Sequence, residues 1–305
     1  MTNSSRSGFV NIIGPPNSGK STLINNLIGK KISIVSSKPQ TTRFCVRGIL
    51  NFKFNDKKEK SQIIFVDTPG IFEPKRNLDK VILQNALKQL NSVDYTILVF
   101  DCYKKNGLDE FLQVMKIISY EKNKISLVLN KIDLIDKTKL LKLAKTLSTN
   151  VFFENIFMIS AIKGDGCEDL VRFLASKVPK SNFLFDEDYL TNIPNQLFSS
   201  EVTREKLFKL LNHELPYNLA VQTVKWLENK NDIKIYQDIY VAKTNHKIIV
   251  LGKNGENIKK TGTMARLELK KIFNKKIHLF LFVKVKKNWI DNPINEKLMG
   301  INQNA

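Results

Sequence analysis

The sequence predicts a two-domain α/β protein in which a domain with a mostly parallel sheet precedes a smaller α+β domain. Apolar strand patterns alternate with helical patterns from Phe9 to about Val178, as in the βαβ units of parallel sheets. The alternation then stops, and the remaining chain predicts the element order αββααβ. A chain of 305 residues is long enough for two hydrophobic cores. We place the first domain at residues 1–180, a linker at 181–200 and the second domain at 201–305.

The composition is that of an ordinary globular protein with a strong basic excess. The formal net charge of +20 favours a polyanionic partner, but only 7 of the 49 basic residues are arginine. A genome biased toward AT-rich codons would raise the lysine content in the same way, so local concentration of charge carries more weight. Residues 253–287 hold eleven basic residues against two glutamates. We expect a nucleic-acid partner to bind there.

Targeting and redox signals are weak. No run of about 18 apolar residues offers a membrane span, and the N-terminal residues lack the apolar stretch of a secretory signal, so we expect a cytoplasmic protein. The three cysteines, Cys45, Cys102 and Cys167, are widely spaced and form no C-x-x-C pair. Structural disulfides and zinc sites are therefore not expected.

A glycine-rich loop after the first strand pattern is the most informative motif. Residues 14–21 read G-P-P-N-S-G-K-S and match the phosphate-binding pattern G-x-x-x-x-G-K-[ST] at every defined position. Residues 8–13 before it have a strand pattern and residues 22–28 after it a helical one. Backbone N–H groups of the loop would then face phosphates at a helix N-terminus. Lys20 would reach the β- and γ-phosphates, and the hydroxyl of Ser21 would bind Mg²⁺.

The second motif, D-T-P-G at residues 67–70, follows the apolar strand pattern of residues 63–66. Groups just beyond the carboxyl ends of parallel strands are where open α/β sheets bind ligands. Asp67 is expected to act on Mg²⁺ directly or through water, and the backbone N–H of Gly70 to meet the γ-phosphate. The next residue is Ile71, where small GTPases of the Ras type carry a water-orienting glutamine, so intrinsic hydrolysis should be slow.

The third and fourth motifs address the base. Residues 130–133 read N-K-I-D after an apolar strand pattern, and the carboxylate of Asp133 can accept hydrogen bonds from guanine N1–H and N2–H₂. Adenine offers no such pair of donors, so the motif indicates a GTPase. Ser160 and Ala161 follow a strand predicted over residues 151–159 and would shape the far side of the base pocket through backbone N–H groups.

A further Mg²⁺ ligand is expected between the first helix and the second strand. Residues 38–43 read K-P-Q-T-T-R and offer two hydroxyls, of which we prefer Thr42 to Thr41. The catalytic candidates are Lys20, Thr42, Asp67 and Gly70, and the Mg²⁺ ligands are Ser21, Thr42 and Asp67. The residues predicted to contact the nucleotide are Gly14, Pro15, Pro16, Asn17, Ser18, Gly19, Lys20, Ser21, Thr22, Asp67, Thr68, Pro69, Gly70, Ile71, Asn130, Lys131, Asp133, Ser160 and Ala161.

The second domain is predicted to bind RNA. The patterns indicate a helix over 201–214, strands over 219–227, 233–242 and 277–285, an apolar strand at 248–251, a helical stretch from residue 256 and a helix over 264–273. With G-K-N-G at residues 252–255, this is the plan of a K-homology domain of the prokaryotic type, whose G-x-x-G turn clamps about four single-stranded nucleotides. The predicted RNA contacts are Gly252, Lys253, Asn254, Gly255, Ile258, Lys259, Lys260 and Arg266.

The chain resembles the Era family, bacterial GTPases of small ribosomal subunit assembly, over nearly its whole length. The resemblance rests on residues 14–21, 40–43, 130–133, 160–161, 204–206, 214–217, 252–255 and 283–286 and on Trp289. It implies GTP and GDP as substrate and product, and binding to single-stranded RNA at the 3′ end of small-subunit (16S) ribosomal RNA. It also implies that GTP favours the RNA-binding arrangement, that the protein is a monomer, and that it contacts the anionic cytoplasmic face of the membrane peripherally.

Two positions of the phosphate-binding loop invite comparison with related GTPases. Asn17 matches an asparagine that helps bind K⁺ in a potassium-stimulated group, which makes it a candidate K⁺ ligand. Ser18 stands where many relatives have an aliphatic residue.

Three other functions were weighed against ribosome assembly. A constitutive RNA-binding protein or chaperone with a structural nucleotide site is disfavoured by the intact Lys20, Ser21, Thr42 and Asp67. A membrane-surface signalling GTPase is disfavoured by the G-x-x-G context. A tRNA-modifying GTPase would need further catalytic domains.

Overall fold

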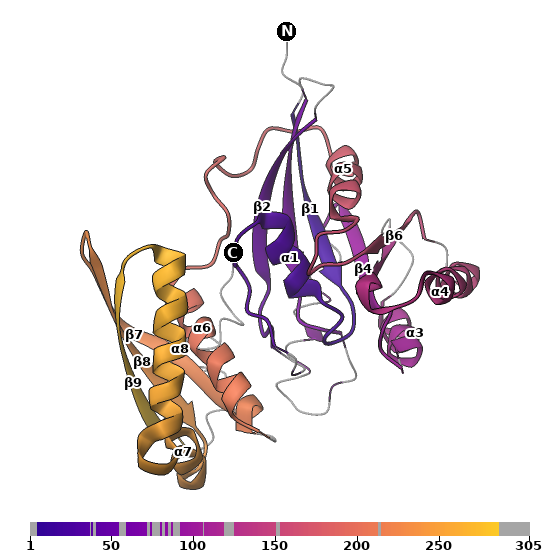
Figure 1. Ribbon diagram of the computed structural model, residues 1–305. Coiled ribbons are helices and arrows are strands. Elements are labelled where there is room, and N and C mark those ends of the chain that lie inside the picture. The colour runs from indigo at the N-terminus through magenta and orange to yellow at the C-terminus, as the bar shows by residue number, and fades with distance from the viewer. Residues whose placement is uncertain are drawn as a thin grey trace. The chain divides into compact units, whose positions relative to one another are not determined.

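The computed structural model describes residues 5–36, 38, 41–54, 59–71, 74, 80, 83–84, 87, 92–105, 107–118, 125–150, 153–212 and 215–286. The chain divides into two compact units, each with its own sheet (Figure 1). Residues 1–33 and 44–192 form the first unit, and residues 34–43 and 193–305 form the second. The domain borders that we placed at 180 and 200 stay predictions. Ten residues between the first helix and the second strand thus belong to the second unit.

The first unit is built on a six-stranded sheet with the order β2-β3-β1-β4-β5-β6. Its strands are β1 (Ser5–Ile13), β2 (Val46–Lys53), β3 (Lys60–Asp67), β4 (Tyr95–Asp101), β5 (Ile125–Asn130) and β6 (Ile156–Ile159). All neighbouring strands are parallel except the pair β2–β3. This confirms the predicted, mostly parallel sheet. The edge strand β2 was not predicted, and β6 covers only the end of the strand expected over residues 151–159, whose first two residues lie outside the described part.

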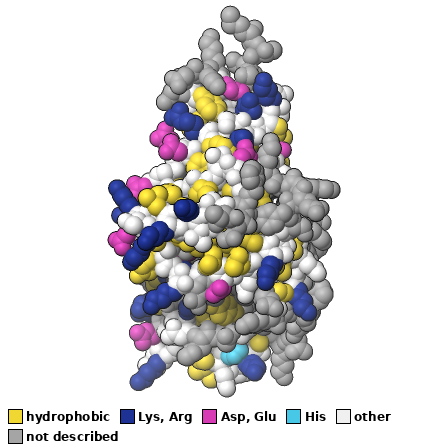
Figure 2. Space-filling view, turned by 90° about the vertical axis from the view of Figure 1, so that its right-hand side faces the viewer, with side chains coloured by type: hydrophobic (Ala, Val, Ile, Leu, Met, Phe, Trp, Pro, Cys, Tyr) yellow, Lys and Arg dark blue, Asp and Glu magenta, His cyan; other side chains and the backbone are white. Residues whose placement is uncertain are grey.

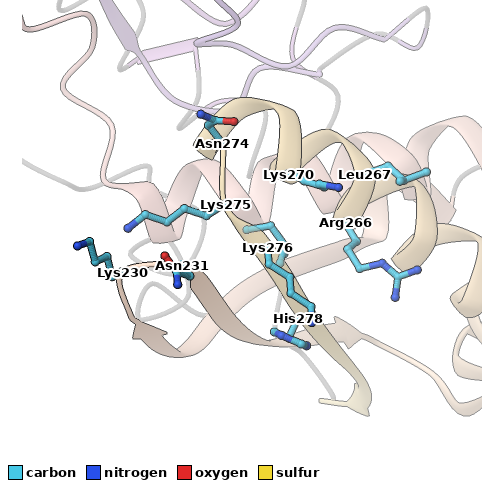
Figure 3. A pocket seen from close by; sticks show the side chains of 10 residues that line it. Lys230, Asn231, Arg266, Leu267, Lys270, Asn274, Lys275, Lys276 and His278 are labelled. Atoms are coloured by element: carbon cyan, nitrogen blue, oxygen red, sulfur yellow. The ribbon is translucent and has the colours of Figure 1, made fainter.

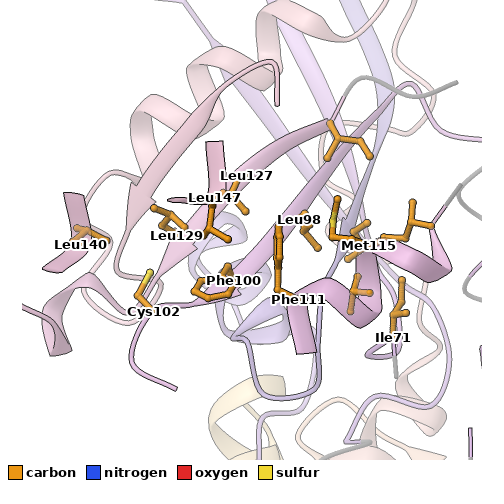
Figure 4. Packing of buried hydrophobic residues seen from close by; sticks show 14 residues of the cluster. Ile71, Leu98, Phe100, Cys102, Phe111, Met115, Leu127, Leu129, Leu140 and Leu147 are labelled. Carbon is orange, nitrogen blue, oxygen red and sulfur yellow. The ribbon is translucent and has the colours of Figure 1, made fainter. Parts of the chain in front are cut away.

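Helices surround this sheet and bury its apolar side chains. They are α1 (Lys20–Ile28), α3 (Gly107–Ile117), α4 (Lys137–Asn150) and α5 (Cys167–Lys177), with a short 3₁₀ turn η1 (Ile132–Leu134). Strands β4 and β5 are buried along their whole length, as expected for parallel strands covered on both faces. In the core, the rings of Phe100 on β4 and Phe111 on α3 meet edge to face with centroids 5.5 Å apart (Figure 4). Burial of this cluster fixes the strand ends that carry the polar motifs.

Part of the segment predicted as a linker packs on the edge of the first sheet. The backbone N–H of Ile49 on β2 donates to the carbonyl of Leu190 at 2.9 Å, and the Asn51 amide donates to the Glu187 carbonyl at 2.8 Å. The side-chain oxygen of Gln62 accepts the backbone N–H groups of Leu184 and Phe185. The backbone groups along β2 therefore find partners in this segment, and the edge is covered.

The second unit has a three-stranded sheet with the order β7-β8-β9. Its elements are α6 (Asn195–Leu210), the 3₁₀ turn η2 (Leu215–Asn218), β7 (Leu219–Glu228), β8 (Asp232–Val241), α7 (Thr244–Leu251), the 3₁₀ turn η3 (Lys253–Gly255), α8 (Glu256–Phe273) and β9 (Lys276–Val285). Strands β7 and β8 are antiparallel, whereas β8 and β9 are parallel. Helices α6 and α8 pack against each other and against the sheet (Figure 1). The predicted order αββααβ is confirmed. No helix in the part of the chain described here is long and apolar enough to cross a membrane.

Three local predictions for the second unit were wrong. The apolar run 248–251 is not a strand but the end of helix α7, in which Val250 is buried while Ile248 and Ile249 are 63% and 51% exposed. A run of four apolar residues does not distinguish a strand from a helix by its periodicity.

The two helical stretches predicted from residue 256 and over 264–273 are one helix, α8. Thr261, Ala265 and Leu269 are buried at helical spacing, and this packing outweighs the low helix propensity of Gly262 between the two predicted stretches. Helix α6 also begins earlier and ends earlier than the predicted range 201–214. Its predicted last residue, Glu214, lies outside the described residues.

Candidate functional site

The loop between β1 and α1 has a backbone shape that requires glycine at two positions. Gly14 and Gly19 have φ angles of 149° and 99°, and Asn17 is also left-handed at 65°. A Cβ atom at Gly19 would stand 2.2 Å from the amide nitrogen of Asn130. The close contact with this amide therefore excludes any side chain at Gly19. Pro15, Pro16 and Ser18 complete the loop, and Thr22 lies in the first turn of α1.

Lys20 is buried inside this loop. Its ammonium donates to the carbonyls of Gly14 at 3.0 Å and Pro15 at 2.8 Å, and the residue is 6% exposed. Burial lowers the pKa of Lys20 to about 8, and the negative charge of Asp67 partly opposes this shift. An ammonium held by neutral carbonyls has no full counter-charge in hydrogen-bond contact, and a phosphate oxygen would supply one.

Asp67 and Ser21 form the part of the site that suits a divalent cation. The Ser21 hydroxyl donates to Asp67 Oδ2 at 2.7 Å, and the Ser33 hydroxyl donates to the same oxygen at 2.9 Å. Asp67 is fully buried, and burial raises the pKa of its carboxyl group. No described residue donates a hydrogen bond to its other oxygen, Oδ1. A buried carboxylate oxygen without a donor, beside a hydroxyl, is a donor set that Mg²⁺ prefers.

The D-T-P-G loop reaches the phosphate-binding loop through its backbone. The Thr68 hydroxyl donates to the Ile12 carbonyl at 2.9 Å, and the Ile71 N–H donates to the Gly14 carbonyl at 3.1 Å. A Cβ atom at Gly70 would lie 3.0 Å from the Pro16 nitrogen. Pro69 lies between Thr68 and Gly70 in this loop. The backbones of the two loops thus run in direct contact.

The side chain of Ile71 faces away from this loop contact. It is 1% exposed and belongs to the hydrophobic cluster around Leu98, Phe111 and Met115 (Figure 4). Its predicted nucleotide contact is thereby limited to the backbone. The residue that stands in the place of a water-orienting glutamine has a packing role here.

Asn130 connects the base motifs to the phosphate-binding loop. Its side-chain amide donates to the Ser18 carbonyl at 2.8 Å, while its side-chain oxygen accepts the N–H groups of Lys131 at 2.8 Å and Ala161 at 3.0 Å. Ser160 is fully buried beside Ala161, and its hydroxyl accepts the N–H of Lys163 at 3.2 Å. One side chain therefore joins three of the four predicted motifs.

Lys131 and Asp133 flank the place where a base would bind. The Lys131 ammonium donates to the Asn17 carbonyl at 3.1 Å and forms an ion pair with Asp101 at 2.5 Å. Lys131 itself has a left-handed backbone, with φ of 67°. Asp133 lies in η1 and is half-buried. Asp101, at the end of β4, was missed in the sequence, where a single aspartate after a strand gives little signal.

Thr42, the third predicted Mg²⁺ ligand, belongs to a different compact unit from Ser21 and Asp67. Ser21 and Asp67 belong to the first unit, whereas Thr42 lies in the segment 34–43 of the second. The Thr41 hydroxyl donates to the Lys38 carbonyl at 2.7 Å within that segment. The preference for Thr42 over Thr41 stays a prediction, and Gln40 lies outside the described residues.

The G-x-x-G turn between α7 and α8 has the backbone that its glycines allow. Gly252 and Gly255 have φ angles of 76° and 77°, and Asn254 between them has 52°. A Cβ atom at Gly252 would lie 2.8 Å from Asn257 Cγ, whereas a Cβ atom at Gly255 would lie 3.9 Å from Ile258 Cγ2. The Asn257 amide donates to the Ile249 carbonyl at 2.9 Å and closes the turn. Lys253 and Asn254 are exposed, and the two glycines are half-buried.

The predicted RNA contacts continue along α8. Lys259 and Lys260 are exposed in its first turns, and Ile258 is half-buried against the core. Arg266 lies about three turns beyond Gly255 and lines a hollow of roughly 670 Å³ (Figure 3). The hollow is also lined by Lys230, Lys270, Lys275 and Lys276. No carboxylate is among the described residues that line it. This hollow was missed in the sequence because its residues come from a hairpin turn, a helix end and a strand.

Basic side chains are not segregated on the face of the molecule in Figure 2, where Lys and Arg stand among acidic and apolar side chains. The hollow at α8, lined by five basic side chains, is more informative than the net charge.

Comparison with known proteins agrees with both halves of this geometry. The family described as "50S ribosome-binding GTPase" matches residues 9–131, and the KH domain family matches residues 214–290. GTPase Era of Sinorhizobium medicae is 45% identical over 97% of this chain and 94% of its own length. The chain belongs to the GTPase Era family. GTPase Era of Agrobacterium fabrum is 44% identical over 97% of this chain and 92% of its own length.

Two solved Era structures have the same fold over nearly the whole chain. Aquifex aeolicus Era, as a tyrosine-to-alanine variant bound to GDP and AlF₄⁻, superposes with a TM-score of 0.86 at 33% identity, covering 97% of this chain and 99% of that one. Era in complex with MgGDPNP and nucleotides 1506–1542 of 16S ribosomal RNA gives 0.88 at 34% identity, with the same coverage. The predicted fold and the resemblance to the Era family are confirmed, and the activity of the chain is GTP hydrolysis.

Proposed function

We propose that this chain couples hydrolysis of Mg²⁺-bound GTP to binding of the 3′ region of 16S ribosomal RNA during maturation of the small ribosomal subunit. One observation carries the proposal: a nucleotide site and a basic G-x-x-G turn occur in one chain of the Era family. A solved relative holds MgGDPNP and nucleotides 1506–1542 of 16S ribosomal RNA. The RNA site consists of the turn at Gly252–Gly255 with Lys253, Lys259, Lys260 and Arg266.

In the proposed mechanism the chain positions the nucleotide by its loops. Backbone N–H groups of residues 14–21 and the ammonium of Lys20 bind the phosphates, while Asp133 selects guanine. Ser21, Asp67 and Thr42 would hold Mg²⁺, which when bound neutralises charge developing on the phosphate oxygens. The N–H of Gly70 contacts the γ-phosphate. Because the side chain of Ile71 is buried, water must be oriented by another group.

K⁺ is a candidate for part of that missing role. The side chain of Asn17 is exposed at the mouth of the phosphate-binding loop, and its carbonyl already accepts a hydrogen bond from Lys131. The proposal includes a slow intrinsic rate, raised by K⁺. It also includes a monomeric protein in the cytoplasm, where ribosomal subunits mature, with peripheral contact between its lysine-rich surface and anionic membrane.

The test is binding of a labelled RNA that copies the 3′ end of 16S ribosomal RNA, with GDP and with a non-hydrolysable GTP analogue, at two salt concentrations. Tighter binding with the analogue is expected. It should be lost in Gly252→Asp/Gly255→Asp, because two carboxylates at the turn repel the phosphodiester. Gln113→Asp/Leu141→Asp is the control, since it adds the same charge at exposed positions of the first unit.

A different result would redirect the proposal. Weak binding that depends steeply on salt, and that neither nucleotide nor the double variant alters, would mean that the lysines attract any polyanion. Vesicles with anionic lipid provide the competing arm. If they displaced the RNA completely and bound more tightly with the GTP analogue, the membrane-surface alternative would replace RNA binding.

A further inference from the structure

Three sequence motifs from distant parts of the chain meet within the second unit. They are the end of the segment 38–43, the R-E-K triplet 204–206 of α6, and the stretch around η2 that includes Tyr217. All described residues of these motifs lie in the compact unit that contains the G-x-x-G turn. Their contacts are made by basic side chains to backbone carbonyls.

Arg43 binds backbone carbonyls at the start of β7 and in the turn before it. Its guanidinium donates to the Leu219 carbonyl at 2.9 Å and to the Tyr217 carbonyl at 3.0 Å, and the residue is only 5% exposed. The planar guanidinium can make both bonds at once, which a lysine ammonium at the same distance would not reproduce. The side chain next to Thr42 is thus fixed on the second unit.

Arg204 fixes the other side of the same segment. Its guanidinium donates to the Thr41 carbonyl and forms an ion pair with Glu201, and the residue is 1% exposed. The same guanidinium stacks over the ring of Phe208, with 5.1 Å to the centroid. Three residues before Thr41, the Lys38 ammonium donates to the Leu211 carbonyl. Thr42 therefore stands between two residues that are both anchored to α6 or to the chain that follows it.

The next residues of the triplet extend the connection to the RNA-binding helix. Lys206 is 3% exposed and forms ion pairs with Glu205 and with Glu268 of α8. Helix α8 begins directly after the G-x-x-G turn. Helix α6 therefore holds the carbonyl of Thr41 through Arg204 and, two residues further on, holds Glu268 of α8 through Lys206. Helix α8 is the helix that presents Lys259, Lys260 and Arg266.

We propose that Arg43 and Arg204 are positioning residues that carry the state of the bound nucleotide to the RNA site. The inference rests on the proposed function, in which Thr42 would hold Mg²⁺, and it requires that this contact forms with GTP and is absent with GDP. Drawing Thr42 to the cation moves the backbone between two anchored residues. Either the second unit follows that movement, or buried guanidinium groups lose their carbonyl partners, which is costly for charged donors.

Coupling of this kind is reciprocal. If the GTP analogue raises the affinity for RNA by a given factor, RNA raises the affinity for the analogue by the same factor. Loss of the anchors should reduce both factors together. Neither Arg43 nor Arg204 belongs to the nucleotide-binding or RNA-binding residues named above, so both ligands should still bind.

The experiment measures the ratio of RNA dissociation constants with GDP and with the analogue, in the wild type, Arg43→Lys, Arg43→Gln and Arg204→Lys. Arg172→Lys is the control, because Arg172 is an exposed arginine that pairs with Glu168 on α5. In the anchor variants the ratio should fall toward 1, while RNA affinity with GDP and nucleotide affinity change by less than about threefold. The control should keep the wild-type ratio. Circular dichroism and thermal unfolding monitor folding, and Arg43→Lys keeps the charge if Arg43→Gln fails to fold.

The possible failures have different signatures. A wild-type ratio retained in Arg43→Lys and Arg204→Lys would overturn the inference and leave the proposed function intact. A wild type that binds RNA equally with both nucleotides would overturn the inference and the coupling within the proposed function. Absence of any RNA binding by the wild type would overturn the proposed function itself. The reciprocal measurement is the affinity for the analogue relative to that for GDP, with and without RNA, and in each variant RNA must change it by the same factor.

Discussion

At the scale of single residues, Lys20 and Asp67 carry opposite charges in a place that disfavours both. Burial lowers the pKa of Lys20 to about 8 and raises that of Asp67. The two shifts have one physical cause, the loss of hydration, and each ion only partly compensates for the other. A phosphate and a divalent cation would reverse both effects. The electrostatics of the loop are therefore those of a site prepared for a charged ligand.

The lowered pKa of Lys20 predicts a proton uptake on nucleotide binding. In the free protein the ammonium loses its proton as the pH rises through about 8, whereas a bound phosphate would keep it protonated. The affinity for GDP should therefore fall above pH 8, with a limiting slope of about tenfold per pH unit. Calorimetric titration at pH 7.5 and 8.5 in two buffers of different ionisation enthalpy measures the protons taken up.

Lys20→Arg is the informative variant for this prediction. A guanidinium stays protonated throughout the range, so its pH dependence should vanish even if the affinity is lower. An equal slope in wild type and variant would assign the titration to another group. In the absence of ligand, the stability of the folded protein changes with pH in the opposite direction to the affinity for GDP. Between pH 8 and the ordinary pKa of 10.5, the unfolded chain binds more protons at Lys20 than the folded protein does, so the free energy of unfolding rises with pH.

At the scale of elements, the strand ends explain why most of the nucleotide site could be predicted. The loops after β1, β3, β5 and β6 each carry a contiguous motif, and parallel strands bring their carboxyl ends to one edge. Asp101 ends β4 at the same edge but has no neighbours that form a pattern. A contiguous motif gives a signal in the sequence, whereas the isolated Asp101 does not.

The turn between α7 and α8 predicts different responses at its two glycines. Asparagine tolerates a positive φ angle, so Gly255→Asn should cost less than about 1 kcal/mol because open space surrounds that position. Gly252→Asn meets Asn257 at 2.8 Å as well and should cost about 2 kcal/mol or more. Urea unfolding of both variants measures the difference. Equal destabilisation would mean that the turn relaxes and that the contact with Asn257 is not restrictive.

The two helices beside this turn mark the limit of local patterns. Residues 248–251 are β-branched or apolar throughout, but in the helix Val250 is buried and Leu251 partly buried against the core, while Ile248 and Ile249 are exposed. In α8, packing against the sheet keeps Gly262 within one continuous helix despite the low helix propensity of glycine. In both places the tertiary core decided the local structure.

At the scale of the whole molecule, the two units have separate cores and separate ligands. Calorimetric unfolding should therefore give two transitions, with GDP raising the midpoint of one and the RNA raising the midpoint of the other. At a free ligand concentration 100 times its dissociation constant, each should gain about 2.7 kcal/mol. A single transition that both ligands shift would contradict this prediction and show that the units unfold together. Gly252→Asp/Gly255→Asp is expected to abolish the RNA shift alone.

The order of helices and strands in each unit could be predicted from the sequence. The assignment of residues 34–43 to the second unit could not. The αββααβ order and the alternating first half followed from hydrophobic patterns that are continuous along the chain. Nothing in residues 34–43 indicates that they belong with residues 193–305. Within the second unit, Arg43 and Arg204 bind backbone carbonyls across this division of the sequence, and a carbonyl leaves no mark in a sequence.

The excursion of residues 34–43 has a consequence for any attempt to take the protein apart. A fragment cut at residue 192 would keep Arg43 but lose the carbonyls of Tyr217 and Leu219. A fragment beginning at residue 193 would leave Arg204 without Thr41. Enzymology on either piece would therefore describe an altered loop rather than an isolated half. No single cut in the polypeptide separates the two compact units, so the two domains have to be studied in one chain.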